Sequence, residues 1–175
     1  MTNEMTTALN GEKLVTETTE YSVFQLPNGK FEKRVKYQAY SSIHPETTEE
    51  QVMLYNLLNG DEALEMKAHI GTIFEIMNVI FSPYDSFDEE TGVSDAGVST
   101  IILGVTDNGE PVTFATSSKT VYWDLQNMFK VFGKPDDENY LGIKVAITGT
   151  KQQRGTQIGL KLLGLSTPTP KDVTR

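Results

Sequence analysis

The basic side chains of one segment near the end of the chain form the pattern that most directly indicates a chemistry. Residues 141–165 contain no Asp or Glu, although the whole chain has a formal net charge of −9. The cations of this segment are Lys144, Lys151, Arg154 and Lys161. An acidic protein that keeps one segment purely basic is expected to bind an anionic partner there. A solvated sheet edge, guarded by lysines against aggregation, predicts the same pattern, so both interpretations stay open.

The segment is expected to be a β-hairpin, which decides where its cations point. Apolar and polar residues alternate on both sides of a polar stretch that ends at Gly155. This alternation is typical of two strands with one buried face, and the polar stretch predicts the loop between them. Lys144 and Lys161 are out of phase with the apolar residues and are expected on the opposite face. Lys151 and Arg154 are expected at the loop.

Length and composition narrow the class of protein. The 175 residues suffice for one domain with an appendage. The absence of Cys excludes a disulfide scaffold and a thiolate metal site, and it fits a reducing cytosol. The first residues lack the basic and apolar regions of a signal peptide, and no apolar run approaches the length of a membrane span. We therefore expect a cytoplasmic protein without a membrane anchor.

The first part of the chain is expected to form a tail and an extension. Residues 1–19 are polar and lack periodicity, which predicts a flexible tail. Residues 20–68 are expected to form a β-hairpin, turning at Asn28-Gly29, followed by a helix. Thr47 and Glu50 have the spacing of a capping box at the start of that helix.

The remainder is expected to be mainly β. Its predicted elements are, in order, a strand at 69–81, a long acidic loop at 82–99, strands at 100–105 and 112–116, a helix that follows residues 117–119 and ends at 132, and the basic hairpin. Three strands, a helix and two strands is the order of the OB-fold, a five-stranded barrel. The predicted domain is therefore an OB-fold at 69–165, followed by a flexible tail at 166–175. Its ligand loops are expected at 82–99 and 150–155.

The stretch from about residue 35 to 165 also resembles a known family. The residues that carry the resemblance are KYQAYSSIHPETTEE, HIGTIFEIMNVIFSPYD, ATSSKTVYWDLQNMFKVFG and the basic hairpin. They are similar to the small single-stranded-DNA-binding proteins of podophages that infect Gram-positive bacteria and replicate by protein-primed synthesis. The resemblance implies a non-enzymatic coat for displaced single strands. The acidic C-terminal tip of bacterial single-strand binders is absent here, because the chain ends in KDVTR, which puts recruitment of repair enzymes through such a tip in doubt.

Candidate binding residues follow from what single strands require. Sequence-tolerant binding needs cations that follow the phosphates and aromatic faces on which bases stack. The candidate cations are Lys119, Lys144, Lys151, Arg154 and Lys161, with Lys33 and Lys36 on the N-terminal hairpin. The candidate aromatic residues are Phe74, Tyr84, Phe87, Phe114, Tyr122 and Trp123, with Tyr37 and Tyr40 beside the N-terminal cations. Core packing is the alternative role for Phe74, Phe114, Tyr122 and Trp123. Tyr84 and Phe87 lie in the acidic loop and have no evident core to enter unless that loop folds back.

Catalytic and metal chemistry find little support in the sequence. The acids of 82–99 do not have the spacing of a calcium loop. No nucleophile elbow, phosphate-binding loop or zinc-protease motif occurs, and both histidines have positions typical of structural residues. We expect no enzyme activity, no metal and no cofactor.

The sequence-based hypothesis is sequence-independent binding of single-stranded DNA, which protects displaced strands during phage DNA replication. Its expected partners are the DNA, further copies of the chain and replication proteins. One alternative is an OB-fold protein-interaction or assembly module that ignores nucleic acid. Another is an oligosaccharide-binding OB-fold, which would have no need of the acid-free hairpin.

Overall fold

The computed structural model describes residues 11–18, 21–60, 62–90 and 93–166. The chain forms two compact units, one of residues 1–38 and 85–96 and the other of residues 39–84 and 97–175. The domain boundaries expected from the sequence stay a prediction. Of the two expected tails, residues 1–10 and 167–175 lie outside the described residues.

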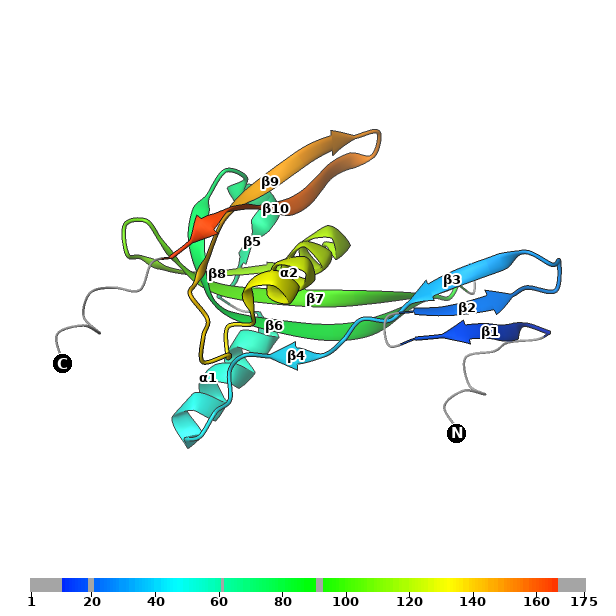
Figure 1. Ribbon diagram of the computed structural model, residues 1–175, viewed down its shortest axis with the longest axis horizontal. Coiled ribbons are helices and arrows are strands. Elements are labelled where there is room, and N and C mark those ends of the chain that lie inside the picture. Colours follow the sequence, from blue (N-terminus) through cyan, green and yellow to red (C-terminus); the bar gives the residue numbers. More distant parts are fainter. Residues whose placement is uncertain (1–10, 19–20, 61, 91–92, 167–175) are drawn as a thin grey trace. The chain divides into compact units, whose positions relative to one another are not determined.

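The smaller unit contains a three-stranded antiparallel sheet, β1-β2-β3 (Figure 1). Its strands are β1 (Lys13–Glu17), β2 (Tyr21–Gln25) and β3 (Phe31–Val35). β2 and β3 form the predicted hairpin, and Phe24 is buried beneath the guanidinium of Arg34 at 4.3 Å. Residues 1–19 were expected to form a flexible tail, and β1 corrects this expectation for residues 13–17. β1 is a polar strand held by its pairing with β2, so the sequence has no apolar periodicity that would predict it.

The larger unit is built on a curled, mainly antiparallel sheet with the strand order β10-β9-β6-β7-β8-β5 (Figure 1). Its elements are β4 (Tyr40–Ser41), α1 (Thr48–Asn59), β5 (Leu64–Glu65), the 3₁₀ helix η1 (Met66–His69), β6 (Ile73–Asp88), β7 (Val93–Thr106), β8 (Pro111–Thr116), α2 (Lys119–Phe132), β9 (Ile143–Gln152) and β10 (Gly155–Leu165). Strands β6 to β10, with α2 between the third and fourth, confirm the predicted OB-fold order.

Two expected loops are replaced by longer strands. The acidic stretch 82–99 was expected to be a loop, but β6 continues to Asp88 and β7 begins at Val93. The expected loop at 150–155 shortens to a two-residue turn, because β9 reaches Gln152 and β10 begins at Gly155. Polar residues continue a strand where the neighbouring strand pairs with them, and such pairing is invisible in a single sequence.

The core lies between the curled sheet and α2. Phe74 of β6, Ile102 of β7 and Phe114 of β8 face inward, and the Phe74 and Phe114 rings lie 5.1 Å apart. α2 contributes Tyr122 and Leu125, both fully buried. The helical period predicted from the sequence places these residues on one stripe, which confirms α2 and its inward face.

The sheet does not close into a barrel by strand pairing. Closure would require β8 to pair with β10, but among the described residues β8 lies between β7 and β5, and β10 stands at the far end of the order. Part of this seam is filled by η1, whose Met66 side chain is completely buried. Hydrogen bonds from Gly71 N to the Ile147 carbonyl, 2.8 Å, and from Ile147 N to the Thr72 carbonyl, 3.0 Å, join the following residues to β9.

No strand pairs with the outer edge of β10 among the described residues. Side chains of α2 and of its N-cap residue, Ser118, form hydrogen bonds with this edge instead. The Ser118 hydroxyl donates to the Ile158 carbonyl at 2.7 Å, and the Asp124 carboxylate accepts the Leu160 N–H at 2.9 Å. Gln157 also donates to Thr120. These contacts fix the first turns of α2 beside β10.

We expect the Asp124→Ala variant to be less stable than the wild type by about 1–3 kcal/mol, because the partly buried Leu160 N–H loses its acceptor. Asn127→Ala on the exposed side of the same helix serves as the control, with a change within about 0.5 kcal/mol. Urea unfolding followed by circular dichroism measures both. Equal effects of the two substitutions would contradict the role of this hydrogen bond.

A cluster around Asp136 joins the entry to α1 with the connection after α2. The Tyr40 hydroxyl donates to Asp136, and His44 Nε2 lies 2.9 Å from Asp136 Oδ2. These two hydrogen bonds, first that from Tyr40, lower the pKa of Asp136. Burial, followed by the hydrogen bond to Asp136, raises the pKa of Tyr40. His44 is thus part of a hydrogen-bonded cluster that links two segments of the fold.

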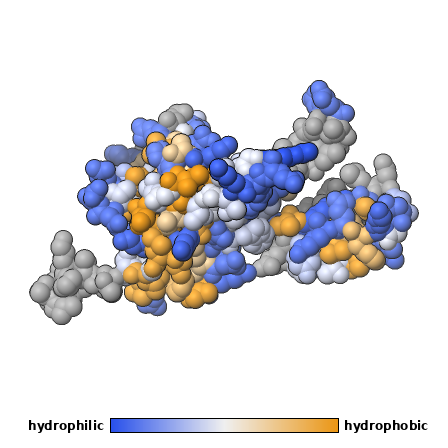
Figure 2. Space-filling model, turned by 90° about the horizontal axis from the view of Figure 1, so that it is seen from above, coloured by the Kyte–Doolittle hydropathy of each residue, from blue (hydrophilic) through white to orange (hydrophobic). Residues whose placement is uncertain are grey.

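Apolar surface reaches the outside in patches between hydrophilic side chains (Figure 2). Exposed large apolar residues occur on α1 and at the end of β10. Within the described part of the chain, no helix is long and apolar enough to cross a membrane.

Candidate nucleic-acid interface

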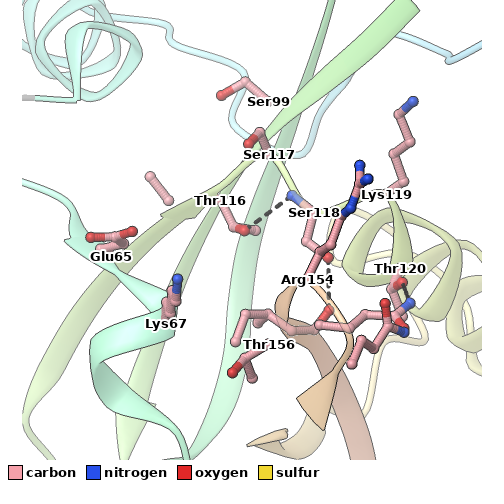
Figure 3. Close-up of a pocket in the computed structure, with 14 residues that line it drawn as sticks. Glu65, Lys67, Ser99, Thr116, Ser117, Ser118, Lys119, Thr120, Arg154 and Thr156 are labelled. Atoms are coloured by element: carbon pink, nitrogen blue, oxygen red, sulfur yellow. Dashed lines mark hydrogen bonds between the residues drawn. The ribbon is translucent and has the colours of Figure 1, made fainter. Parts of the chain in front are cut away.

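An open groove of about 800 Å³ lies where the seam between β8 and β10 is not filled (Figure 3). Its walls are the end of β8, the first residues of α2, the start of β10 and the segment around η1. The residues that line it include Ser99, Thr116, Ser117, Thr120, Gln152, Thr156, Gln157 and Ile158, together with the charged side chains described below. Most of the lining is therefore polar.

The first turn of α2 forms one wall of the groove. Ser118 caps the helix, because its side chain accepts the Val121 N–H at 3.3 Å, and its own N–H donates to Thr116 Oγ1 at 3.1 Å. A helix N-terminus carries a partial positive charge that favours anions. The exposed Lys119 follows directly, so a full and a partial positive charge coincide here.

The hairpin β9–β10 supplies the opposite wall. Its turn consists of Gln153 and Arg154, and β10 begins at Gly155 with a φ of 90°, a conformation that glycine adopts most readily. Arg154 is exposed and lines the groove. Figure 3 shows Arg154 and Lys119 projecting to the same side of the groove, from two different elements.

The charges of the groove are mainly positive. Lys67 of η1 joins Lys119 and Arg154 in the lining, and Glu65 is the acid that the lining includes. Lys67 lies at the wall opposite Arg154, close to Glu65 (Figure 3). Lys67 was not among the residues predicted from the sequence, because a single basic residue in so short an element forms no recognisable pattern. The available signal was its position between the predicted helix of the extension and the predicted strand at 69–81.

Three other predicted cations lie outside the lining of this groove. Lys144 Nζ is 2.6 Å from Asp107 Oδ1, in the turn between β7 and β8, so its charge is already paired. Lys151 is exposed near the end of β9, next to Gln152 of the lining. Lys161 is exposed on β10, out of phase with the buried Leu160 as predicted.

Three of the predicted aromatic contacts are core residues. Phe74, Phe114 and Tyr122 have exposures of 0%, 1% and 1%. Tyr122 packs edge-on against Phe81 at 4.8 Å and accepts a hydrogen bond from the Gln126 amide. A ring without exposed surface offers no face to a base, so the prediction that these three residues contact nucleic acid is corrected.

Trp123 and Tyr84 keep accessible surface. Trp123 is half-buried edge-on against Tyr122, 4.9 Å between ring centres, and lies one helical turn after Lys119 on the same face. Tyr84 is 45% exposed, and its ring covers Gly97 of β7: a Cβ at Gly97 would lie 2.5 Å from the ring. Only a glycine permits this approach, and it leaves part of the Tyr84 ring open to solvent.

The N-terminal candidates belong to the smaller unit. Lys33 lies over the ring of Tyr21 at 4.3 Å, and Lys36 is paired with Glu17. Tyr37 is half-buried. These contacts already engage both lysines. The side chain of Phe87 lies outside the described residues. No group of three or more potential ligands for a metal occurs among the side chains that the structure describes.

No protein-family model and no solved structure matches this chain. A single-stranded DNA-binding protein of Bacillus phage GA-1 is 39% identical over 171 residues, which cover 94% of this chain and 97% of that protein. This similarity extends through both compact units and confirms the family resemblance seen in the sequence. The chain therefore belongs to the family of phage single-stranded DNA-binding proteins.

Proposed function

We propose that the protein binds single-stranded DNA without sequence preference, in the groove between α2 and the β9–β10 hairpin. The observation that carries the proposal is the convergence of Lys67, Lys119, Arg154 and the N-terminus of α2 on one open groove. The name of the GA-1 relative supports single-stranded DNA as the ligand.

Phosphate contacts supply most of the affinity in this proposal. Each cation that neutralises a phosphate releases condensed counterions, so the affinity falls as salt rises. The groove is open at the surface, so that a strand can enter from the side. The hydroxyl side chains of its lining can both donate and accept hydrogen bonds, so they do not select one base.

Base stacking supplies the second contribution. Tyr84 and Trp123 present partly exposed rings, and stacking on an aromatic side chain tolerates every base. Lys151 and Lys161 extend the positive surface along the hairpin beyond the groove. Lys33, Lys36 and Tyr37 remain predictions for a contact made by the smaller unit.

The biological role that we propose is a non-enzymatic coat on strands displaced during phage DNA replication, in the cytoplasm of the host bacterium. Copies of the chain and replication proteins are the proposed partners besides DNA. This role fits the polar, shallow groove, which has the character of a binding surface.

Titration with oligonucleotides tests the proposal, because the single tryptophan lies one turn from Lys119. We expect oligo-dT to change Trp123 emission in a saturable manner and to bind more weakly as salt rises. Oligo-rU and duplex DNA are the comparisons, with duplex DNA expected to bind least. A flat signal together with no gel shift at low salt would reject single-strand binding and favour the protein-interaction module.

A further inference from the structure

Helix α1 presents apolar side chains that its own domain leaves uncovered. None of its residues is buried. Val52, Met53, Tyr55 and Leu58 are 54%, 48%, 65% and 49% exposed. Figure 1 shows α1 projecting from the sheet of the larger unit. Isolated helices of this length are marginal in water, so exposed apolar residues on such a helix indicate a surface used by a partner.

One face of α1 and the turn after it form a groove of about 490 Å³. The helix contributes Glu49, Val52, Met53, Asn56 and Leu57, which follow the helical spacing of a single face. Its C-cap Gly60 and the turn residues Glu62 and Ala63 complete the groove. The floor is thus apolar, and carboxylates stand at both ends. A groove of this kind is suited to a small number of apolar side chains from another molecule.

The charge around the groove restricts the partner. Residues 37–66 contain no Lys or Arg, and besides Glu49 and Glu62 they include Glu46 and Glu50 around the start of α1. The phosphates of DNA would be repelled. A second copy that packed its own α1 here would bring the carboxylates of two identical acidic helices together without a compensating base.

We propose that the α1 groove is a docking site for a protein segment that presents apolar side chains flanked by Lys or Arg. The apolar side chains enter between Met53 and Ala63, and the cations meet Glu49 and Glu62. The surface is separate from the cationic groove, so the proposal does not rest on single-strand binding by that groove. A protein that coats DNA could in this way hold a basic partner next to the strand.

Labelled model peptides test the proposal with the intact protein. We expect a short amphipathic peptide of Leu and Lys to bind saturably by fluorescence anisotropy. A Leu and Glu peptide with the same apolar face, and a Lys and Ser peptide with the same charge, are expected not to saturate. Val52→Ser with Met53→Ser should weaken binding of the Leu and Lys peptide about tenfold, corresponding to about 1.4 kcal/mol. Both side chains are exposed, so circular dichroism should show an unchanged fold.

Matched charge variants separate a specific site from general attraction to an acidic protein. Glu49→Gln with Glu62→Gln removes two carboxylates of the groove. Glu110→Gln with Glu138→Gln removes two exposed carboxylates elsewhere. We expect the first pair to weaken peptide binding several-fold and the second to leave it unchanged. Equal loss in both pairs would overturn the proposal.

Two further measurements exclude the other occupants. Sedimentation that shows a dimer abolished by Val52→Ser with Met53→Ser would overturn the proposal in favour of a second copy. The oligo-dT titration of the same variant should match the wild type, since α1 lies outside the cationic groove. Lost DNA binding would instead place the helix in the nucleic-acid surface and overturn the docking site.

Discussion

Removing two cations of the groove should weaken the binding of single strands and flatten its salt dependence. For Lys119→Gln with Arg154→Gln we expect oligo-dT to bind about tenfold more weakly at low salt, a difference of about 1.4 kcal/mol. If each residue meets one phosphate, the slope of log affinity against log salt should fall in magnitude by about 1.4, since each contact with a single strand contributes about 0.7. Anisotropy of labelled oligo-dT at several salt concentrations measures both quantities.

The matched control for this experiment is Lys130→Gln, at the other end of α2. It removes one positive charge from an exposed position of the same helix but lies outside the groove lining. A weaker effect of Lys130→Gln on the affinity for oligo-dT would show that the position of the removed charge matters, and not only the net charge of the protein. If Lys130→Gln weakened binding as much per charge as the double variant, the groove would not be the binding surface.

Truncation of Met66 should cause a large loss of stability. Its side chain has no exposed surface and fills the seam between β8 and β10. We expect Met66→Ala to lower the free energy of unfolding by about 2–5 kcal/mol, through lost burial and the cavity left behind. Urea unfolding followed by circular dichroism measures this loss.

Two further variants show whether the loss of stability comes from the lost side-chain volume at Met66 or from any substitution in η1. Met66→Leu nearly conserves the volume and should cost less than about 1.5 kcal/mol. Lys67→Ala, at the exposed neighbouring position, should stay within about 0.5 kcal/mol. A mild effect of Met66→Ala, no larger than that of Lys67→Ala, would show that η1 does not support the seam.

Local patterns predicted the regular elements well. Thr47 and Glu50 form the expected capping box, and the apolar period of α2 runs from Val121 to Phe129 as the core stripe. The family resemblance was likewise visible, because it depends on long stretches of sequence. The capping box and the helical stripe are encoded within a few turns or residues, where a single sequence is informative.

Contacts between distant residues escaped prediction. Alternation along a strand shows that Phe74 and Phe114 share a face with other apolar residues, but it does not show which face is covered. Lys144 was expected to be available for an anion, but it is paired with Asp107, so a residue of β9 meets a turn far away in the sequence. The seam depends on Met66 in a four-residue helix, which is too short to show any period.

The hydrogen bonds from Ser118 and Asp124 to β10 also bear on the kinetics of a coat protein. They connect the wall that carries Lys119 directly to the strand that leads from Arg154, so the backbones of these two walls are already positioned together. A site that is preorganised in this way loses little conformational entropy on binding. Because the groove is open at the surface, we expect release of a bound strand to require no movement of a lid among the described residues.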